Sequence, residues 1–344
     1  MGRRRTVSAL VRLRFTGGLA LMVAVSAPVS VHAAPLVRSG SSVPSSSGHL
    51  YVGSELGCGV QSYTLHAGVP ASKPDFTYQA CTPFTIAPDG MLVASVPETS
   101  KQVEHLRWYP LHSHRSVREL TLPAPYATSY LSVALDTNGY IYTLFYYSSS
   151  LAQGRLLSAT RSSTSFPCAT LGVMVFAPTA LGPANYLTCF EAGLNPFPFS
   201  YQRGFAVSPE GDVYVPDFFQ VVVYGNARTS PVFIRTLTGP GFTDTENAAL
   251  DDADLFVMNV LAPDKHSNIS EYDPLGNVIV HPRRRLEYPQ PQTWCGRVAV
   301  GKHYLYVGGD NAVLVYDRNA NGRTYPVATL NLPNVCPFDI ATGP

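Results

Sequence analysis

The sequence predicts an all-β protein with the architecture of a six-bladed β-propeller, closed by pairing of its C-terminal strand with its N-terminal blade. Three observations predict this: a tyrosine-ending apolar strand recurs at the interval of a four-stranded blade, a hairpin precedes most copies, and the chain ends carry two halves of one blade. The composition agrees, because 20 Tyr, 16 Phe, 27 Gly and 29 Pro favour short strands and tight turns.

The first repeat is a short apolar strand that ends in tyrosine. Its copies lie at residues 60–63, 106–109, 221–224, 269–272 and 313–316, with a degenerate copy at 155–158. The last residues of successive copies are 46, 49, 66, 48 and 44 positions apart. This is the period of a four-stranded blade with one insertion of about 20 residues.

The second repeat is a hairpin in which two apolar strands flank a turn, in most copies one rich in Asp, Asn and Gly. Its copies lie at residues 84–94, 133–143, 205–215, 249–257 and 298–307. Asp-Gly and Asn-Gly between apolar runs are strong hairpin signals. These hairpins supply the first and second strands of five blades.

The two ends of the chain complete the sixth blade. Residues 49–53 read as a second strand with no first strand before it, and residues 337–343 read as a first strand with nothing after it. Pairing them closes the ring and leaves no long sheet edge exposed. A seven-bladed alternative would need another blade at 171–200, where we find no turn-strand-turn motif and expect a loop or an extended outer strand.

The N-terminal segment has the features of an export signal. Five arginines precede an apolar stretch at 19–31, which is too short to span a bilayer comfortably, and small residues follow at a cleavage position after Ala33. We therefore predict a signal peptide at 1–33, a Ser/Gly/Pro-rich linker at 34–48 and the propeller at 49–344. The expected location is extracytoplasmic (secreted, periplasmic or cell-surface). The sequence does not decide between Sec and twin-arginine export. The alternative to a cleaved signal peptide is an uncleaved N-terminal anchor.

The charge of the mature chain argues against a nucleic-acid partner. Without residues 1–33 the chain has 19 Lys+Arg against 23 Asp+Glu, a net charge of about −4. Nucleic-acid binders normally carry a basic surplus for phosphate contacts. No later segment is apolar for long enough to span a membrane. We expect a monomer whose partner is an envelope or extracellular protein or glycan.

All six cysteines follow the leader, as expected for an oxidising compartment. Six cysteines allow 15 pairings, and the blade map favours Cys58–Cys81, Cys168–Cys189 and Cys295–Cys336. The first pair would tie the N-terminal blade to its neighbour, the second would hold the inserted loop, and the third would fasten the closing strand. Free buried thiols are the alternative.

The blade-building residues resemble a known superfamily. Residues 211–217 followed by 221–224 resemble an NHL repeat, and residues 87–94 resemble a turn of SMP-30-like and YncE-like propellers. The resemblance covers about 49–344 and lies in residues that specify strands and turns, so it implies a fold more than an activity.

Candidate ligand-face residues gather where inner strands begin and second strands end. The positions are Arg203, Glu246, Asn247, Arg297 and Asp339 on inner strands and Asp217 and Asn259 after second strands. By resemblance to SMP-30-like lactonases, oxygens of Glu246, Asn247, Asp217, Asn259 and Asp339 could hold a divalent metal such as calcium. The alternative is that Asp217 and Asn259 cap turns while the arginines pair with Glu246 and Asp339.

The sequence therefore predicts a non-catalytic propeller scaffold with no cofactor, which binds a protein, glycan or cell-envelope ligand at the channel face. Its aromatic loops at 126–130, 145–147 and 197–201 would supply contact surface, or else pack between blades. The alternative function is a metal-dependent lactonase or related hydrolase, whose catalytic residues the sequence does not identify.

Overall fold

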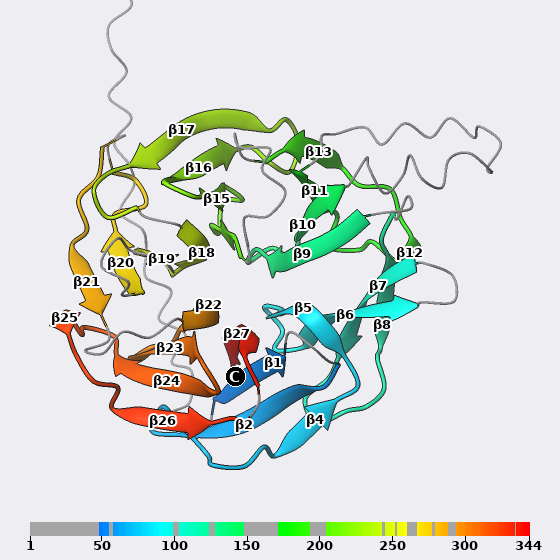
Figure 1. Ribbon diagram of the computed structural model, residues 1–344. Helices are drawn as coiled ribbons and strands as arrows, with labels where there is room; N and C mark the ends of the chain where they lie inside the picture. Colours follow the sequence, from blue (N-terminus) through cyan, green and yellow to red (C-terminus); the bar gives the residue numbers. More distant parts are fainter. Residues whose placement is uncertain are drawn as a thin grey trace, which may run out of the picture. The chain divides into compact units, whose positions relative to one another are not determined.

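The computed structural model describes residues 48–54, 58–98, 103–123, 128–147, 171–192, 204–242, 245–251, 253–259, 267–276, 279–287, 294–333 and 335–344, which all belong to one compact unit. The predicted leader and nearly all of the linker lie outside these residues. The described chain is all-β, and six small sheets surround a common centre (Figure 1). Among the described residues there is no helix with the length and apolar character needed to cross a membrane.

Blades 1 to 3 follow one plan, with an inner strand and three further strands in antiparallel order. Blade 1 contains β27 (Pro337–Gly343), β1 (His49–Ser54), β2 (Val60–His66) and β4 (Phe76–Tyr78), with the short β3 (Val69–Pro70) beside β2. Blade 2 contains β5 (Cys81–Ile86), β6 (Leu92–Glu98), β7 (Val103–Tyr109) and β8 (Arg118–Thr121), with β12 (Gly182–Pro183) beside β8. Blade 3 contains β9 (Thr128–Leu135), β10 (Ile141–Tyr147), β11 (Leu171–Phe176) and β13 (Thr188–Glu191).

Blades 4 to 6 repeat the plan. Blade 4 contains β14 (Ala206–Val207), β15 (Val213–Asp217), β16 (Gln220–Gly225) and β17 (Val232–Thr238). Blade 5 contains β18 (Thr245–Leu250), β19 (Leu255–Asn259), β20 (Asn268–Tyr272) and β21 (Arg284–Glu287), with β25 (Gly322–Arg323) beside β21. Blade 6 contains β22 (Trp294–Val300), β23 (Tyr304–Gly309), β24 (Ala312–Asp317) and β26 (Ala328–Asn331).

The predicted closure is confirmed. Strand β27 pairs antiparallel with β1, from His49 opposite Gly343 to Val52 opposite Ile340 and beyond. The last strand of the chain thus becomes the inner strand of the first blade. The six-bladed prediction is correct.

One buried aromatic residue per blade explains the tyrosine repeat. Each third strand contains one aromatic residue of the repeat, and these residues are Tyr63, Tyr109, Phe176, Tyr224, Tyr272 and Tyr316. Each belongs to a different one of six apolar clusters, and each cluster joins the sheets of two adjacent blades. Burying a large aromatic ring contributes several kcal/mol. The tyrosine repeat therefore marks the residue that packs each blade against the preceding blade.

Glycines with a positive φ form three of the five predicted hairpin turns. Gly90, Gly139 and Gly211 have φ of 84°, 77° and 93°, a region that residues with a side chain rarely occupy. Each glycine amide donates to the carbonyl three residues earlier, as in Gly139 N to Asp136 O at 2.9 Å. These turns set the register between the first and second strands of their blades.

The prediction that residues 171–200 form a loop or an extended outer strand was wrong. Residues 171–176 form the third strand of blade 3 and residues 188–191 its fourth. The degenerate copy at 155–158 lies outside the described residues, so the insertion falls between β10 and β11. With Phe176 as the repeat residue, the intervals become 46, 67, 48, 48 and 44. Phenylalanine fills the interblade space as tyrosine does, which is why the tyrosine pattern missed it.

Candidate functional site

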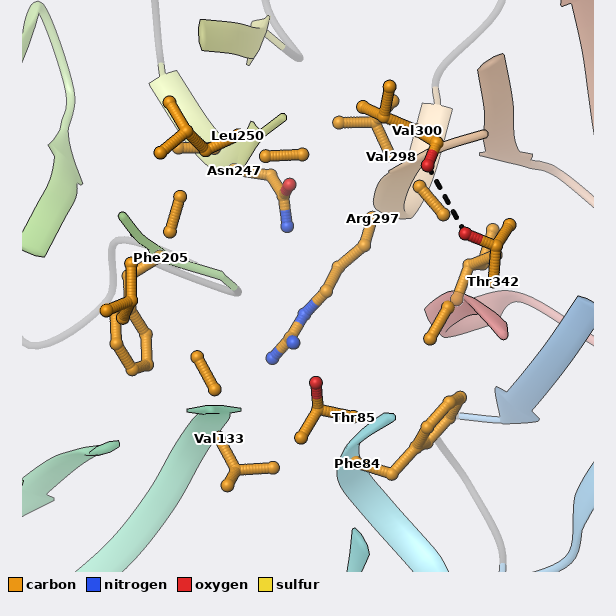
Figure 2. Close-up of a pocket in the computed structure, with 18 residues that line it drawn as sticks. Phe84, Thr85, Val133, Phe205, Asn247, Leu250, Arg297, Val298, Val300 and Thr342 are labelled. Atoms are coloured by element: carbon orange, nitrogen blue, oxygen red, sulfur yellow. Dashed lines mark hydrogen bonds between the residues drawn. The ribbon is translucent and has the colours of Figure 1, made fainter. Parts of the chain in front are cut away.

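A cavity of about 220 Å³ lies at the centre of the ring, lined by 18 residues (Figure 2). All six blades contribute, through residues 84–85, 133–134, 205–207, 247–250, 297–300 and 340–342. Most of these side chains are apolar. The polar ones come from Thr85, Asn247, Arg297 and Thr342, and the Thr342 hydroxyl donates to the Val300 carbonyl at 3.2 Å. Polar recognition in the cavity therefore falls mainly to Asn247 and Arg297.

Arg297 extends from β22 of blade 6 across the cavity (Figure 2). Its Nη1 lies 3.1 Å from Oδ1 of Asp339 in blade 1, and its Nη2 donates to the Leu131 carbonyl of blade 3 at 3.2 Å. Asp339 is fully buried, and its Oδ2 accepts a hydrogen bond from the Phe84 backbone amide at 2.8 Å. One arginine thus links three blades around the channel.

Burial governs the electrostatics of this pair. It raises the pKa of Asp339 to about 6, although the Arg297 charge and two backbone amides act in the opposite direction. It also lowers the pKa of Arg297, against the opposing effect of Asp339. At neutral pH the two groups form an ion pair, and below about pH 6 protonation of Asp339 leaves the arginine charge unbalanced.

Two hydrogen-bond donors in the cavity have no partner. Arg297 Nε and Asn247 Nδ2 are buried and make no hydrogen bond, although their residues are only 8% and 1% exposed. Both flank Gly204, where an added Cβ would lie 2.2 Å from the Asn247 nitrogen and 3.1 Å from the Arg297 nitrogen. Buried polar groups normally have partners. An oxygen acceptor placed between these two nitrogens would satisfy both donors.

The other predicted ligand-face residues have separate surroundings. Asp217 Oδ2 accepts from Gln220 Nε2 at 2.8 Å. Asn259 accepts from the Thr245 hydroxyl and donates to Asn268 within blade 5, at 3.0 Å each. Asp217 and Gln220 flank the β15–β16 turn, as the turn-capping alternative expects, whereas the Asn259 contacts join neighbouring strands. The ion pair of Arg297 with Asp339 agrees with the other part of that alternative.

The carboxylates of the predicted calcium set are not gathered at one point. Among the described residues, the carboxylates of Asp217, Glu246 and Asp339 do not form a group close enough to share a metal. Glu246 is buried next to Asn247, on β18. Arg203 lies outside the described residues. The calcium site stays a prediction.

The cysteines match the expected oxidised state. Cys58 and Cys81 form a disulfide that ties the β1–β2 connection of blade 1 to the start of β5 in blade 2. Cys189 and Cys336 are also disulfide-bonded. The side chains of Cys168 and Cys295 lie outside the described part, so these two predicted pairings stay predictions.

The aromatic loops are described in part. Tyr130 and Phe145 are buried, with ring centroids 6.4 Å apart, and both belong to the cluster between blades 2 and 3. Tyr130 and Phe145 therefore pack between blades and do not form a contact surface for a partner. The side chains of residues 126–129, 147 and 197–201 lie outside the described part of the chain.

Comparison with solved structures agrees with the architecture. A protein of unknown function from Bacteroides caccae superposes with a TM-score of 0.56 at 12% identity, covering 87% of this chain and 99% of that chain. A chain of a nidogen/laminin complex gives 0.53 at 13% identity, covering 87% and 98%. The chain is a β-propeller. At these identities the likeness shows the fold alone, and neither a protein-family model nor a curated protein matches the sequence.

Proposed function

We propose that the protein is an exported, non-catalytic scaffold that binds an extracytoplasmic protein, and that an acidic group of this protein inserts into the channel. The observation that carries the proposal is the pair of unpartnered donors, Arg297 Nε and Asn247 Nδ2, in the central cavity. A carboxylate presents two acceptor oxygens and forms charge-assisted hydrogen bonds with a guanidinium. An acidic side chain or a C-terminal carboxylate suits both donors.

The size of the cavity favours a single inserted group. Pockets for drug-sized molecules usually measure roughly 300–1,000 Å³, whereas this cavity measures about 220 Å³. It accommodates a side chain better than a whole metabolite. The rest of the binding energy would then come from the loops around the channel, as in interfaces where one anchor enters a pocket.

The chemistry of the channel favours binding over catalysis. Asp339 is occupied by Arg297 and by the Phe84 amide. The described residues that line the cavity with the donor pair include no carboxylate, histidine or cysteine, and their other polar side chains are Thr85 and Thr342. The lactonase alternative stays a prediction from resemblance. The leader-like N-terminus and the disulfides support an extracytoplasmic location.

Thermal unfolding with acetate and acetamide as probes tests the donor pair. At constant ionic strength acetate should raise the unfolding midpoint saturably, while neutral acetamide and chloride should not, because binding to the folded state stabilises it. The acetate effect should be larger at pH 5.5 than at pH 7.5, because burial raises the pKa of Asp339 to about 6 and its protonation leaves Arg297 unopposed.

Two cavity variants make the test specific. Asn247→Asp places a carboxylate beside Arg297 and should abolish the acetate effect. Thr85→Val, a substitution of nearly equal shape in the same cavity, should leave it unchanged. An acetate effect that is equal in the wild-type protein and Asn247→Asp, or equal for acetate and acetamide, would refute the proposed site.

A further inference from the structure

Three side chains with metal-binding chemistry meet at the junction of blades 1 and 2. His49 begins β1 and pairs with Gly343, at the end of the inner strand β27. Asp75 precedes β4 of the same blade, and His112 lies in the turn between β7 and β8 of blade 2. The cluster is therefore at the face where inner strands end, whereas the Cys58–Cys81 disulfide joins the same two blades where β5 begins.

The spacing of the three ligand atoms suits one tetrahedral ion. Asp75 Oδ2 lies 3.2 Å from His49 Nδ1 and 3.1 Å from His112 Nε2, and all three atoms lie within 4.8 Å of one another. Zinc bonds of roughly 2.0–2.2 Å place neighbouring ligand atoms about 3.3–3.5 Å apart in a tetrahedron. Small side-chain movements would bring the three atoms into this arrangement.

The His49 nitrogen has no alternative partner. His49 is 6% exposed, and its Nδ1 makes no hydrogen bond, although Asp75 Oδ2 lies at an ion-pair distance of 3.2 Å. A buried ring nitrogen without a partner is costly. A cation between the three atoms would satisfy it.

Neighbouring groups already hold the candidate ligands in place. The hydroxyls of Ser62 and Thr64 donate to Asp75 Oδ1 and Oδ2 at 2.7 and 2.9 Å. The Tyr78 hydroxyl accepts from the His112 backbone amide at 3.0 Å. The two imidazoles meet edge to face, with centroids 5.3 Å apart. Such outer contacts orient ligands in metal sites.

We propose that His49, Asp75 and His112 bind a divalent transition metal of the zinc class, which joins blade 1 to blade 2. Two imidazole nitrogens and one carboxylate oxygen suit Zn²⁺, whereas Ca²⁺ takes six to eight oxygens. The three protein ligands leave a fourth position for water or for an atom of a bound molecule. This site is separate from the channel, and its test is independent of the acetate experiment.

Zinc binding by the full oxidised chain without a histidine tag tests the proposal. After dialysis against Zn²⁺ and removal of unbound ion, elemental analysis should give one zinc per chain, and competition with a chelator should give the affinity. His112→Asn should weaken binding at least about tenfold, since even loss of an outer-shell contact costs 10–100-fold. Asparagine tolerates the left-handed backbone of His112, whose φ is 54°, so the turn should persist.

His114→Asn is the matched control. His114 is exposed, two residues from His112, and its ring lies against Phe76 with centroids 4.5 Å apart, outside the cluster. It should bind zinc like the wild-type protein, and Co²⁺ should give visible absorption in this control but not in His112→Asn. Asp75→Asn, a second variant of a ligand, should also lose binding. No zinc on the wild-type protein, or equal binding in His112→Asn and the control, would refute the site and leave Asp75 as a hydrogen-bond partner of His112 with His49 at ion-pair distance.

Discussion

Replacing Arg297 by methionine should destabilise the propeller strongly and in a pH-dependent way. The change keeps much of the apolar stem but leaves Asp339, which has no exposed surface, without its ion-pair partner. Removing one member of a buried ion pair costs about 3–5 kcal/mol. Urea unfolding at pH 7.5 should show a loss of this size in the free energy of unfolding.

The loss should shrink at low pH. The pKa of Asp339 is already raised to about 6 in the folded protein, and removing the arginine charge raises it further. A folded-state pKa above the unfolded value gives stability that is complete at low pH and is lost as the pH rises through the folded-state pKa. The variant should therefore lie closer to the wild-type protein at pH 5 than at pH 7.5.

Two companion variants separate this explanation from general damage to the blade. Adding Asp339→Asn to Arg297→Met should recover much of the loss, because the amide oxygen can still accept from the Phe84 amide while the buried charge disappears. Arg323→Met removes an exposed arginine 3.4 Å from Glu287 and should cost less than about 1 kcal/mol. A loss below about 1 kcal/mol for Arg297→Met, or no recovery in the double variant, would refute the reasoning.

Two further predictions concern blades 1 and 2. Burial raises the pKa of Glu104 to about 7 against a hydrogen bond from Ser95, so Glu104→Gln should stabilise the protein by about 3 kcal/mol at pH 8 and hardly at pH 4.5, as measured by urea unfolding. An equal gain at both pH values would contradict the assigned cause. Replacing both Cys58 and Cys81 by alanine opens a loop with a sequence separation of 23 and should lower the free energy of unfolding by about 3 kcal/mol. A thermal midpoint unchanged from that of the oxidised wild-type protein would contradict this prediction.

Most of the fold could be predicted because it repeats. Hairpins, three of which turn at a glycine with a positive φ, and third strands that contain a buried aromatic residue recur at blade intervals, and each repeat has one physical role in the structure. The exception was blade 3, where 155–158 offered a regular interval and Phe176 did not match the tyrosine pattern. A pattern of apolar residues ending in any aromatic residue would have found β11.

The candidate sites could be predicted only in part. Alignment of the blades places Asn247, Arg297 and Asp339 at the channel, because the inner strands of all blades surround the central axis of the propeller. It does not show which arginine nitrogen remains unpaired, since that depends on side-chain direction. His49, Asp75 and His112 come from a strand start and two turns, where the repeat carries no information on spacing. Their meeting is visible only in three dimensions.

The pairing of β1 with β27 has a consequence for the order of folding. Blade 1 lacks its inner strand until residues 337–343 have been synthesised, so five blades can form while the ring stays open. The contacts that close it join segments about 290 positions apart, which makes them highly non-local and slow to form. An open ring keeps an unpaired strand at each end, and a chain in this state would be a natural substrate for chaperones. The domain is therefore expected to complete its fold only when β27 pairs with β1.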